Sequence, residues 1–146
     1  GRGGRRPRAA GGRVCAAGCE GCCGMGRAAA IATITRLQET DGVAQIGRGG
    51  TLRRQGRDAQ AQAHGVAITQ SGPVQGPALR FGGDDMTTMQ IPRAMMFAGE
   101  AAKRGVYMHP THHWFLSTAH SDEDIERSLA ATDVAFARVK ESFGDG

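Results

Sequence analysis

Four histidines near the end of the chain are the residues best suited to chemistry. They are His109, His112, His113 and His120. Imidazole nitrogens bind zinc, nickel or copper and exchange protons near neutral pH. The spacing differs from that of the helical H-E-x-x-H motif, and Pro110 places a turn within the group. We therefore expect a turn with packed histidines rather than a metal site. A hydrolase that uses His109 or His120 as its base would also need a nucleophile, and none is evident.

A second group of reactive side chains lies near the start of the chain. It consists of Cys15, Cys19, Cys22 and Cys23. Structural zinc sites usually combine two separated pairs of ligands, whereas these cysteines follow one another closely. We expect free thiols within a basic tail, residues 1–27, whose Gly- and Arg-rich composition offers little apolar surface and predicts disorder. The tail lacks interleaved aromatic residues, which argues against specific recognition of nucleic acid.

Length and charge limit the class of protein. The chain has 146 residues, the usual size of one domain, and its net charge of +4 is concentrated in the tail. No apolar run approaches the roughly 20 residues needed to cross a bilayer, so we expect no membrane span. The basic start is not followed by the apolar core of a signal peptide. These features predict a cytoplasmic protein.

Hydrophobic periodicity predicts two helices after the tail, over residues 28–40 and 41–65. The apolar face of the first contains Ile31, Ile34 and Leu37. The predicted inner face of the second consists of spaced aliphatic and small residues: Val43, Ile46, Leu52, Ala59 and Ala63. Four glycines lie in the same helix, at positions 47, 49, 50 and 56. Each should weaken it by about 1 kcal/mol relative to alanine.

Two strands and a third helix are predicted next. The strands span residues 66–70 and 78–81, joined by the turn-rich link SGPVQGP. Pro92 suits the first turn of the helix, and Gly105 suits the left-handed position that ends it. The predicted core stripe of this helix contains Ile91, Met95, Met96, Ala98 and Ala102. An adaptable methionine-rich binding face is the alternative.

The last segment, Gly105 to Phe143, predicts a short strand, the histidine turn, a second strand and a capped helix. Ser121 lies three residues before Asp124, so it can cap the helix. The helix repeats apolar residues at steps of four and three: Ile125, Leu129, Thr132, Phe136, Val139 and Phe143. The predicted order is α, α, β, β, α, β, β, α. It favours an α+β fold with a small, mostly antiparallel sheet covered by helices on one face.

The same segment resembles the C-terminal end of class III pyridoxal-phosphate aminotransferases, the group that includes glutamate-1-semialdehyde aminomutase. The resemblance rests on three short motifs and the start of the last helix: Arg104-Gly105-Val106, His109-Pro110, Phe115-Leu116-Ser117, and Ala119-His120-Ser121 followed by Asp122, Glu123, Asp124 and Ile125. It extends over residues 28–146 and implies the small C-terminal domain of a fold-type I enzyme.

The resemblance also implies where the cofactor is held. In the family, the Schiff-base lysine, the acid that pairs with the pyridine nitrogen and most phosphate contacts lie on a large domain that would precede this sequence. The only lysines here, Lys103 and Lys140, have the pattern of solvated surface residues. We therefore expect no cofactor on this chain alone and no activity without the large domain. A truncated gene, a shifted reading frame and an alternative start codon each explain the chain.

Candidate substrate contacts also follow from the resemblance. The turn at His112, His113 and Trp114 corresponds to one that reaches the mouth of the active site. In the aminomutase this turn carries a glutamate that is lacking here, which favours a related aminotransferase with another amino donor. Arg80 can meet a substrate carboxylate from its strand, with a surface ion pair as the alternative.

The resemblance further implies a homodimer in the full-length family. It also implies an apolar surface that the large domain covers, formed by Ile31, Ile34, Trp114 and Phe115. The competing hypothesis is a non-enzymatic binding module whose basic, cysteine-containing tail contacts nucleic acid or metal.

Overall fold

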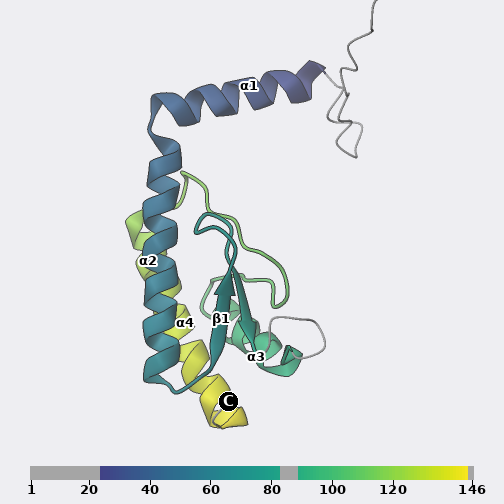
Figure 1. Ribbon diagram of the computed structural model, residues 1–146, viewed down its shortest axis with the longest axis vertical. Helices are drawn as coiled ribbons and strands as arrows, with labels where there is room; N and C mark the ends of the chain where they lie inside the picture. The colour runs from purple at the N-terminus through teal and green to yellow at the C-terminus, as the bar shows by residue number, and fades with distance from the viewer. Residues whose placement is uncertain (1–23, 83–88, 145–146) are drawn as a thin grey trace, which may run out of the picture. The chain divides into compact units, whose positions relative to one another are not determined.

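The computed structural model describes residues 24–82 and 89–144, and it divides the chain into two units, residues 1–40 and 41–146. Its elements are shown in Figure 1: α1 (Gly24–Glu39), α2 (Gly42–Ala63), β1 (Ile68–Ser71), β2 (Ala78–Phe81), α3 (Ile91–Ala102) and α4 (Asp122–Phe143). The four cysteines and most of the predicted tail lie outside the described residues. None of the described helices is long and apolar enough to span a membrane.

Helix α1 is the described part of the first unit. It begins at Gly24, four residues before the predicted start of the helix at residue 28. Alanine-rich segments favour helix without any tertiary contact. The helix buries none of its residues, and Ile31 and Ile34 are exposed.

Helix α2 faces its neighbours with glycines and arginines, so the predicted inner face is wrong. Val43, Leu52, Ala59 and Ala63 are exposed and Ile46 is half-buried, whereas the buried residues are Gly42, Gly50, Arg53, Arg57 and Ala61. A Cβ at four of the helix's glycines would lie within 4 Å of another segment. A Cβ at Gly50 would lie 2.2 Å from the Val74 carbonyl oxygen, and one at Gly56 would lie 2.6 Å from Leu129 Cδ2. The glycines therefore permit close packing on this face, although they lower helix propensity.

Strands β1 and β2 form an antiparallel hairpin in the register Ile68 to Phe81 and Ser71 to Ala78. The prediction of β2 is confirmed, and β1 begins two residues later than predicted. The predicted strands on either side of the histidine turn do not form. Val106 N donates instead to Ala101 O at the end of α3. Trp114 N and Leu116 N donate to carbonyls of the hairpin link, and residues 24–82 and 89–144 supply no strand partner for these segments.

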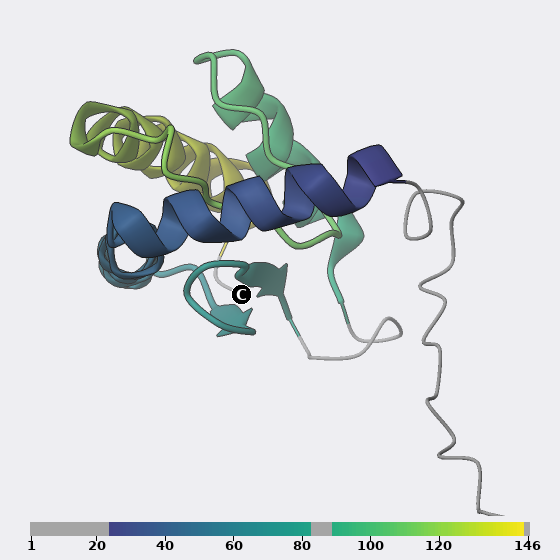
Figure 2. The same cartoon turned by 90° about the horizontal axis from the view of Figure 1, so that it is seen from above.

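Three phenylalanines from β2, α3 and α4 form the centre of the core. The ring centroids of Phe97 and Phe136 lie 4.7 Å apart, and those of Phe81 and Phe97 lie 5.4 Å apart. Helices α3 and α4 lie on the same side of the hairpin (Figure 2). The structure is thus an α+β fold with a small antiparallel sheet, as predicted.

Helix α3 is rotated relative to its predicted stripe. Ala94, Phe97, Ala98 and Ala101 are buried together with Arg93, whereas Ile91, Met95 and Ala102 are exposed and Met96 is half-buried. Phe97, rather than Met95 or Met96, fills the core. Burial of its aromatic ring removes a large apolar surface from water. The predicted apolar stripe of α4 is buried or half-buried except for Phe143, which is exposed at the end of the helix.

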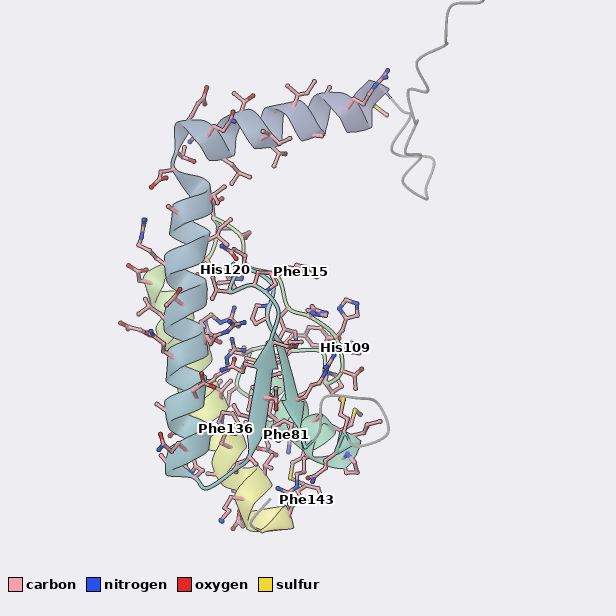
Figure 3. The ribbon with its side chains drawn as sticks, viewed as in Figure 1. Phe81, His109, Phe115, His120, Phe136 and Phe143 are labelled. Carbon is pink, nitrogen blue, oxygen red and sulfur yellow. The ribbon has the colours of Figure 1, made fainter. Side chains whose placement is uncertain are left out.

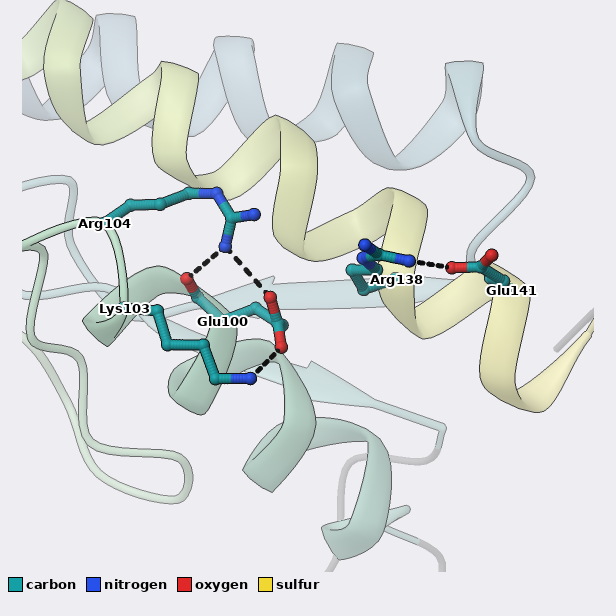
Figure 4. A network of polar contacts seen from close by, with 5 residues as sticks. All are labelled: Glu100, Lys103, Arg104, Arg138 and Glu141. Atoms are coloured by element: carbon teal, nitrogen blue, oxygen red, sulfur yellow. Dashed lines mark hydrogen bonds and ion pairs between the residues drawn. The ribbon is translucent and has the colours of Figure 1, made fainter.

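The end of α3 carries a group of ion pairs centred on the half-buried Glu100. Glu100 Oε1 lies 2.5 Å from Lys103 Nζ, and Glu100 Oε2 lies 2.9 Å from Arg104 Nη1 (Figure 4). The hydrogen bonds from Lys103 and then Arg104 lower the pKa of Glu100. Gly105 follows in the left-handed region with φ of 79°, which confirms its predicted role in ending the helix.

Candidate functional site

The histidine loop, residues 106–121, joins α3 to α4 and is fixed to the hairpin link. Trp114 N donates to Pro77 O at 3.1 Å, and Leu116 N donates to Gln75 O at 3.0 Å. Within the loop, Trp114 Nε1 donates to His109 O at 2.8 Å. The chain thus uses hydrogen bonds between two loops, rather than a sheet, to position its histidines.

The histidine side chains are held mainly by nearby backbone groups. His109 Nδ1 accepts from Thr111 N at 3.2 Å, and His120 Nδ1 accepts from Ser117 N at 3.1 Å. The ring centroids of His109 and His112 lie 5.9 Å apart. Figure 3 shows His109 and His120 at well-separated points of the loop, with Phe115 between them. Among residues 24–82 and 89–144, no three potential ligands are grouped as a metal would require.

A pocket of about 400 Å³ opens between the histidine loop, α2 and the start of α4. Its polar lining combines two arginines and three histidines with one carboxylate and two hydroxyl-bearing residues: Arg53, Tyr107, His109, His113, His120, Asp124, Arg127 and Ser128. Two of the four predicted substrate contacts, His113 and Trp114, also line it. His112 and Arg80 do not; Arg80 lies on β2 opposite Thr69 and is half-buried.

Behind the tryptophan lies a buried arginine that the histidine motif does not predict. The Arg57 guanidinium lies 4.9 Å from the centroid of the Trp114 ring, and the residue is 1% exposed. Its Nε donates to Arg53 O at 3.0 Å, but Nη1 and Nη2 have no hydrogen-bond partner in the part of the chain that the structure describes. Burial, followed by repulsion from Arg53, lowers the pKa of Arg57 to about 9.

A pattern in the sequence identifies this arginine face once α2 is known. Arg53 and Arg57 are separated by one helical turn, and both lie on the face that contains Gly50 and Ala61. Arginines in a polar helix usually face solvent, which is why hydrophobic periodicity alone misses them. Their position among small residues is the available signal.

The carboxylate in the pocket already has partners. Asp124 Oδ2 accepts from Ser121 N and from Ser121 Oγ, each at 2.9 Å. In return, Ser121 Oγ accepts from Asp124 N, which completes a capping box and confirms the predicted helix cap. The backbone hydrogen bond and then the hydroxyl hydrogen bond lower the pKa of Asp124.

The exposed apolar residues differ from the predicted set. Phe115 is 72% exposed, and Ile31 and Ile34 are also exposed. Trp114 is half-buried and packs against the core, so it exposes less apolar surface than the other three predicted residues. Its indole donates to the loop and its face stacks on Arg57, so part of the ring is removed from solvent.

Neither lysine lies where it would hold a cofactor in the pocket. Lys103 is exposed and paired with Glu100, and Lys140 is half-buried near the end of α4. The pocket lining contains no lysine. The described residues therefore do not fit a covalently held pyridoxal phosphate.

Comparisons with known proteins identify relatives of the chain, although no protein family model matches it. It is 40% identical over 116 residues to the aminopentol aminotransferase of Sphingopyxis macrogoltabida, covering 80% of this chain and 26% of that protein. It is 37% identical over 67 residues to a glutamate-1-semialdehyde 2,1-aminomutase of Staphylococcus haemolyticus, covering 44% of this chain and 15% of that protein.

A solved structure shares the fold. The pyridoxal-phosphate internal aldimine form of the FumI protein of Sphingopyxis sp. MTA144 matches with a TM-score of 0.72 and 38% identity. The match covers 81% of this chain and 28% of that one. Fold and sequence together define an α+β region of pyridoxal-phosphate-dependent aminotransferases. More closely, the chain corresponds to the C-terminal region of the class III enzymes, and it spans about a quarter of the length of the two Sphingopyxis relatives.

Proposed function

We propose that the chain is the small domain of a class III aminotransferase and serves amino transfer only together with a cofactor-bearing large domain. The observation that carries the proposal is the match to FumI, which extends over most of this chain but only 28% of that protein. The complete enzyme would move an amino group between an amine or amino acid and a carbonyl compound, as a homodimer.

The lysine positions support the proposed inactivity of the chain alone. Pyridoxal phosphate, when bound, supplies the electron sink for amino transfer, and it needs a lysine to hold it. Lys103 is engaged by Glu100 on the surface, and neither lysine reaches the pocket. In the proposal the lysine therefore comes from the large domain.

The histidine loop is the proposed contribution of this chain to the active site. His113 and Trp114 line a pocket, and Phe115 presents an exposed aromatic ring beside them. We assign His112, His113 and Trp114 to the rim that faces the substrate. Arg80 is the proposed contact for a substrate carboxylate, from its separate position on β2.

Borohydride reduction in the presence of pyridoxal phosphate tests the proposal. We expect no stoichiometric label at Lys103 or Lys140 and no amino transfer by the full chain. The intact aminopentol aminotransferase, treated in parallel, provides the positive control. Stoichiometric labelling of one lysine together with turnover would instead show an autonomous enzyme. A folded chain that binds zinc stoichiometrically through its cysteines would favour the binding-module hypothesis.

A further inference from the structure

The buried arginines of α2 lack the acidic partners that such residues normally have. Arg53 is 7% exposed and Arg57 is 1% exposed. Arg53 Nε and both Nη atoms of Arg57 are buried without a hydrogen-bond partner among the described residues. A buried charge without a partner is costly, so such guanidinium groups normally bind a carboxylate or a phosphate.

The nearby charged groups do not supply that anion. Asp58 Oδ1 accepts from Gln70 Nε2 at 2.7 Å, and the Asp124 carboxylate is engaged by Ser121. Arg54 adds a third positive charge on α2, although its Nη2 donates to Gly72 O at 2.6 Å. Asp58 partly offsets the charge of Arg57, and Asp124 partly offsets that of Arg127. Among the described residues, however, no ion pair joins Arg53, Arg57 or Arg127 to a carboxylate.

The pocket brings this charge to an accessible position. Arg53 lines it from α2, and the exposed side chain of Arg127 lines it from α4. His109, His113 and His120 add ring nitrogens, whose donor or acceptor roles depend on the tautomer. Guanidinium groups present paired N–H donors that match the oxygens of carboxylates and phosphates.

We propose that this pocket binds a small oxyanion, a carboxylate or a phosphate, between Arg53 and Arg127. Arg57 lies behind Trp114 and adds positive charge without lining the pocket. The assignment concerns this chain's own residues and does not depend on amino transfer. It holds for a free ligand and for an acidic group that another domain inserts.

Titration of the full chain with methyl phosphate and with acetate tests the site, using calorimetry and thermal unfolding at a fixed ionic strength set by chloride. We expect saturable binding of at least one anion and a melting temperature that rises with its concentration. Stronger binding of methyl phosphate would indicate a phosphate ligand, and stronger binding of acetate would indicate a carboxylate. Absence of saturable binding by both would overturn the proposal.

Three variants locate the binding. Arg127→Gln, at an exposed position, should weaken binding at least about tenfold, and Arg53→Gln should weaken it similarly. Arg138→Gln removes the same charge from an exposed ion pair on α4 that does not line the pocket, and should leave the affinity within about twofold. If Arg53→Gln does not fold, Arg127→Gln decides. Affinity in Arg127→Gln equal to that of the unmodified chain would contradict the site.

Discussion

The two packing regions of the second unit, residues 41–146, bury different types of residue. Around Phe81, Phe97 and Phe136 the core is aromatic and apolar, and these rings are fully buried. Along α2 the buried face is made of glycines and arginines. The three rings of the aromatic core bury one another, whereas the α2 face leaves guanidinium nitrogens without hydrogen-bond partners among the described residues. The aromatic side is thus packed within the domain, whereas the α2 side is where we propose that an anion binds.

The two regions also gain stability in different ways. Burial of aromatic rings is favourable in proportion to the apolar area removed from water. The α2 face gains stability from the close approach that glycine permits, and it loses stability through the desolvation of charge. Substitutions should therefore destabilise the first region and act in either direction in the second.

The largest expected effect is in the aromatic core. Phe136→Ala should lower the free energy of unfolding by about 3–5 kcal/mol, because it leaves a cavity beside Phe97 and Phe81. Phe115→Ala, at a ring that is mostly exposed, should change it by less than about 0.5 kcal/mol. Urea unfolding followed by circular dichroism measures both. Equal effects would show that the phenylalanine cluster is not the core.

A stabilising substitution is expected on the α2 face. Arg57→Met replaces an unpaired buried charge with an apolar side chain and should raise the free energy of unfolding by about 1–4 kcal/mol. Because the pKa of Arg57 is lowered to about 9, the unfolded state binds more protons above that pH. The unmodified chain should therefore recover stability as pH rises above 9, and the advantage of the variant should shrink.

Arg54→Met is the matched control for this substitution. Arg54 donates to Gly72 O and Ser71 O, so its loss should destabilise the chain by about 1–3 kcal/mol. The two differ at the Nη atoms: Arg54 Nη2 is hydrogen-bonded, whereas neither Nη atom of Arg57 has a partner among the described residues. Destabilisation by both substitutions would contradict the stabilising effect expected from this difference.

Glycine replacement tests the close approach of α2. Gly50→Ala should cost about 1–3 kcal/mol, since the added Cβ would lie 2.2 Å from the Val74 carbonyl oxygen. Gly99→Ala, in α3, meets nothing within 4 Å and should stabilise the chain by up to about 1 kcal/mol. The melting temperature and the free energy of unfolding should therefore fall in Gly50→Ala and rise in Gly99→Ala. An increase in both variants would show that α2 packs loosely.

The smallest expected effect is at the cap of α4. Ser121→Ala should cost about 0.5–2 kcal/mol. The pKa of Asp124 is lowered in the folded chain, so its contribution is present above its ordinary pKa and is lost as pH falls through the folded value. Asp124→Asn should therefore destabilise the chain at neutral pH, with a difference that disappears in acid. A difference independent of pH would rule out the carboxylate as its source.

Periodicity and turn residues predict most elements of the fold but fewer of its faces. Ser121, Pro92 and Gly105 have local roles fixed by backbone hydrogen bonding and dihedral angles, and all three are confirmed. The predicted face of α2 fails because glycine contacts depend on neighbours distant in the sequence. The two predicted strands that do not form also depend on distant neighbours. Trp114 and Leu116 are residue types common in strands, but their N–H groups donate to carbonyls of the link between β1 and β2.

The candidate site likewise combines residues that a local motif predicts with residues that distant contacts bring together. His113 and Trp114 are in a motif that can be recognised by its letters, and both line the pocket. Arg53 and Arg127 come from separate helices, and only the packing of α2 against α4 brings them to one pocket. No local pattern records that contact.

Reconstitution tests the central claim most directly. This full chain would be coexpressed with a shortened aminopentol aminotransferase of Sphingopyxis macrogoltabida that ends before the region aligned with this chain. Amino transfer would then be measured. We predict a stable complex with activity that neither piece has alone, and weaker activity when His113 and Trp114 are both replaced by alanine. A shortened enzyme that folds and binds its cofactor but neither binds this chain nor gains activity from it would contradict the assignment as a small domain.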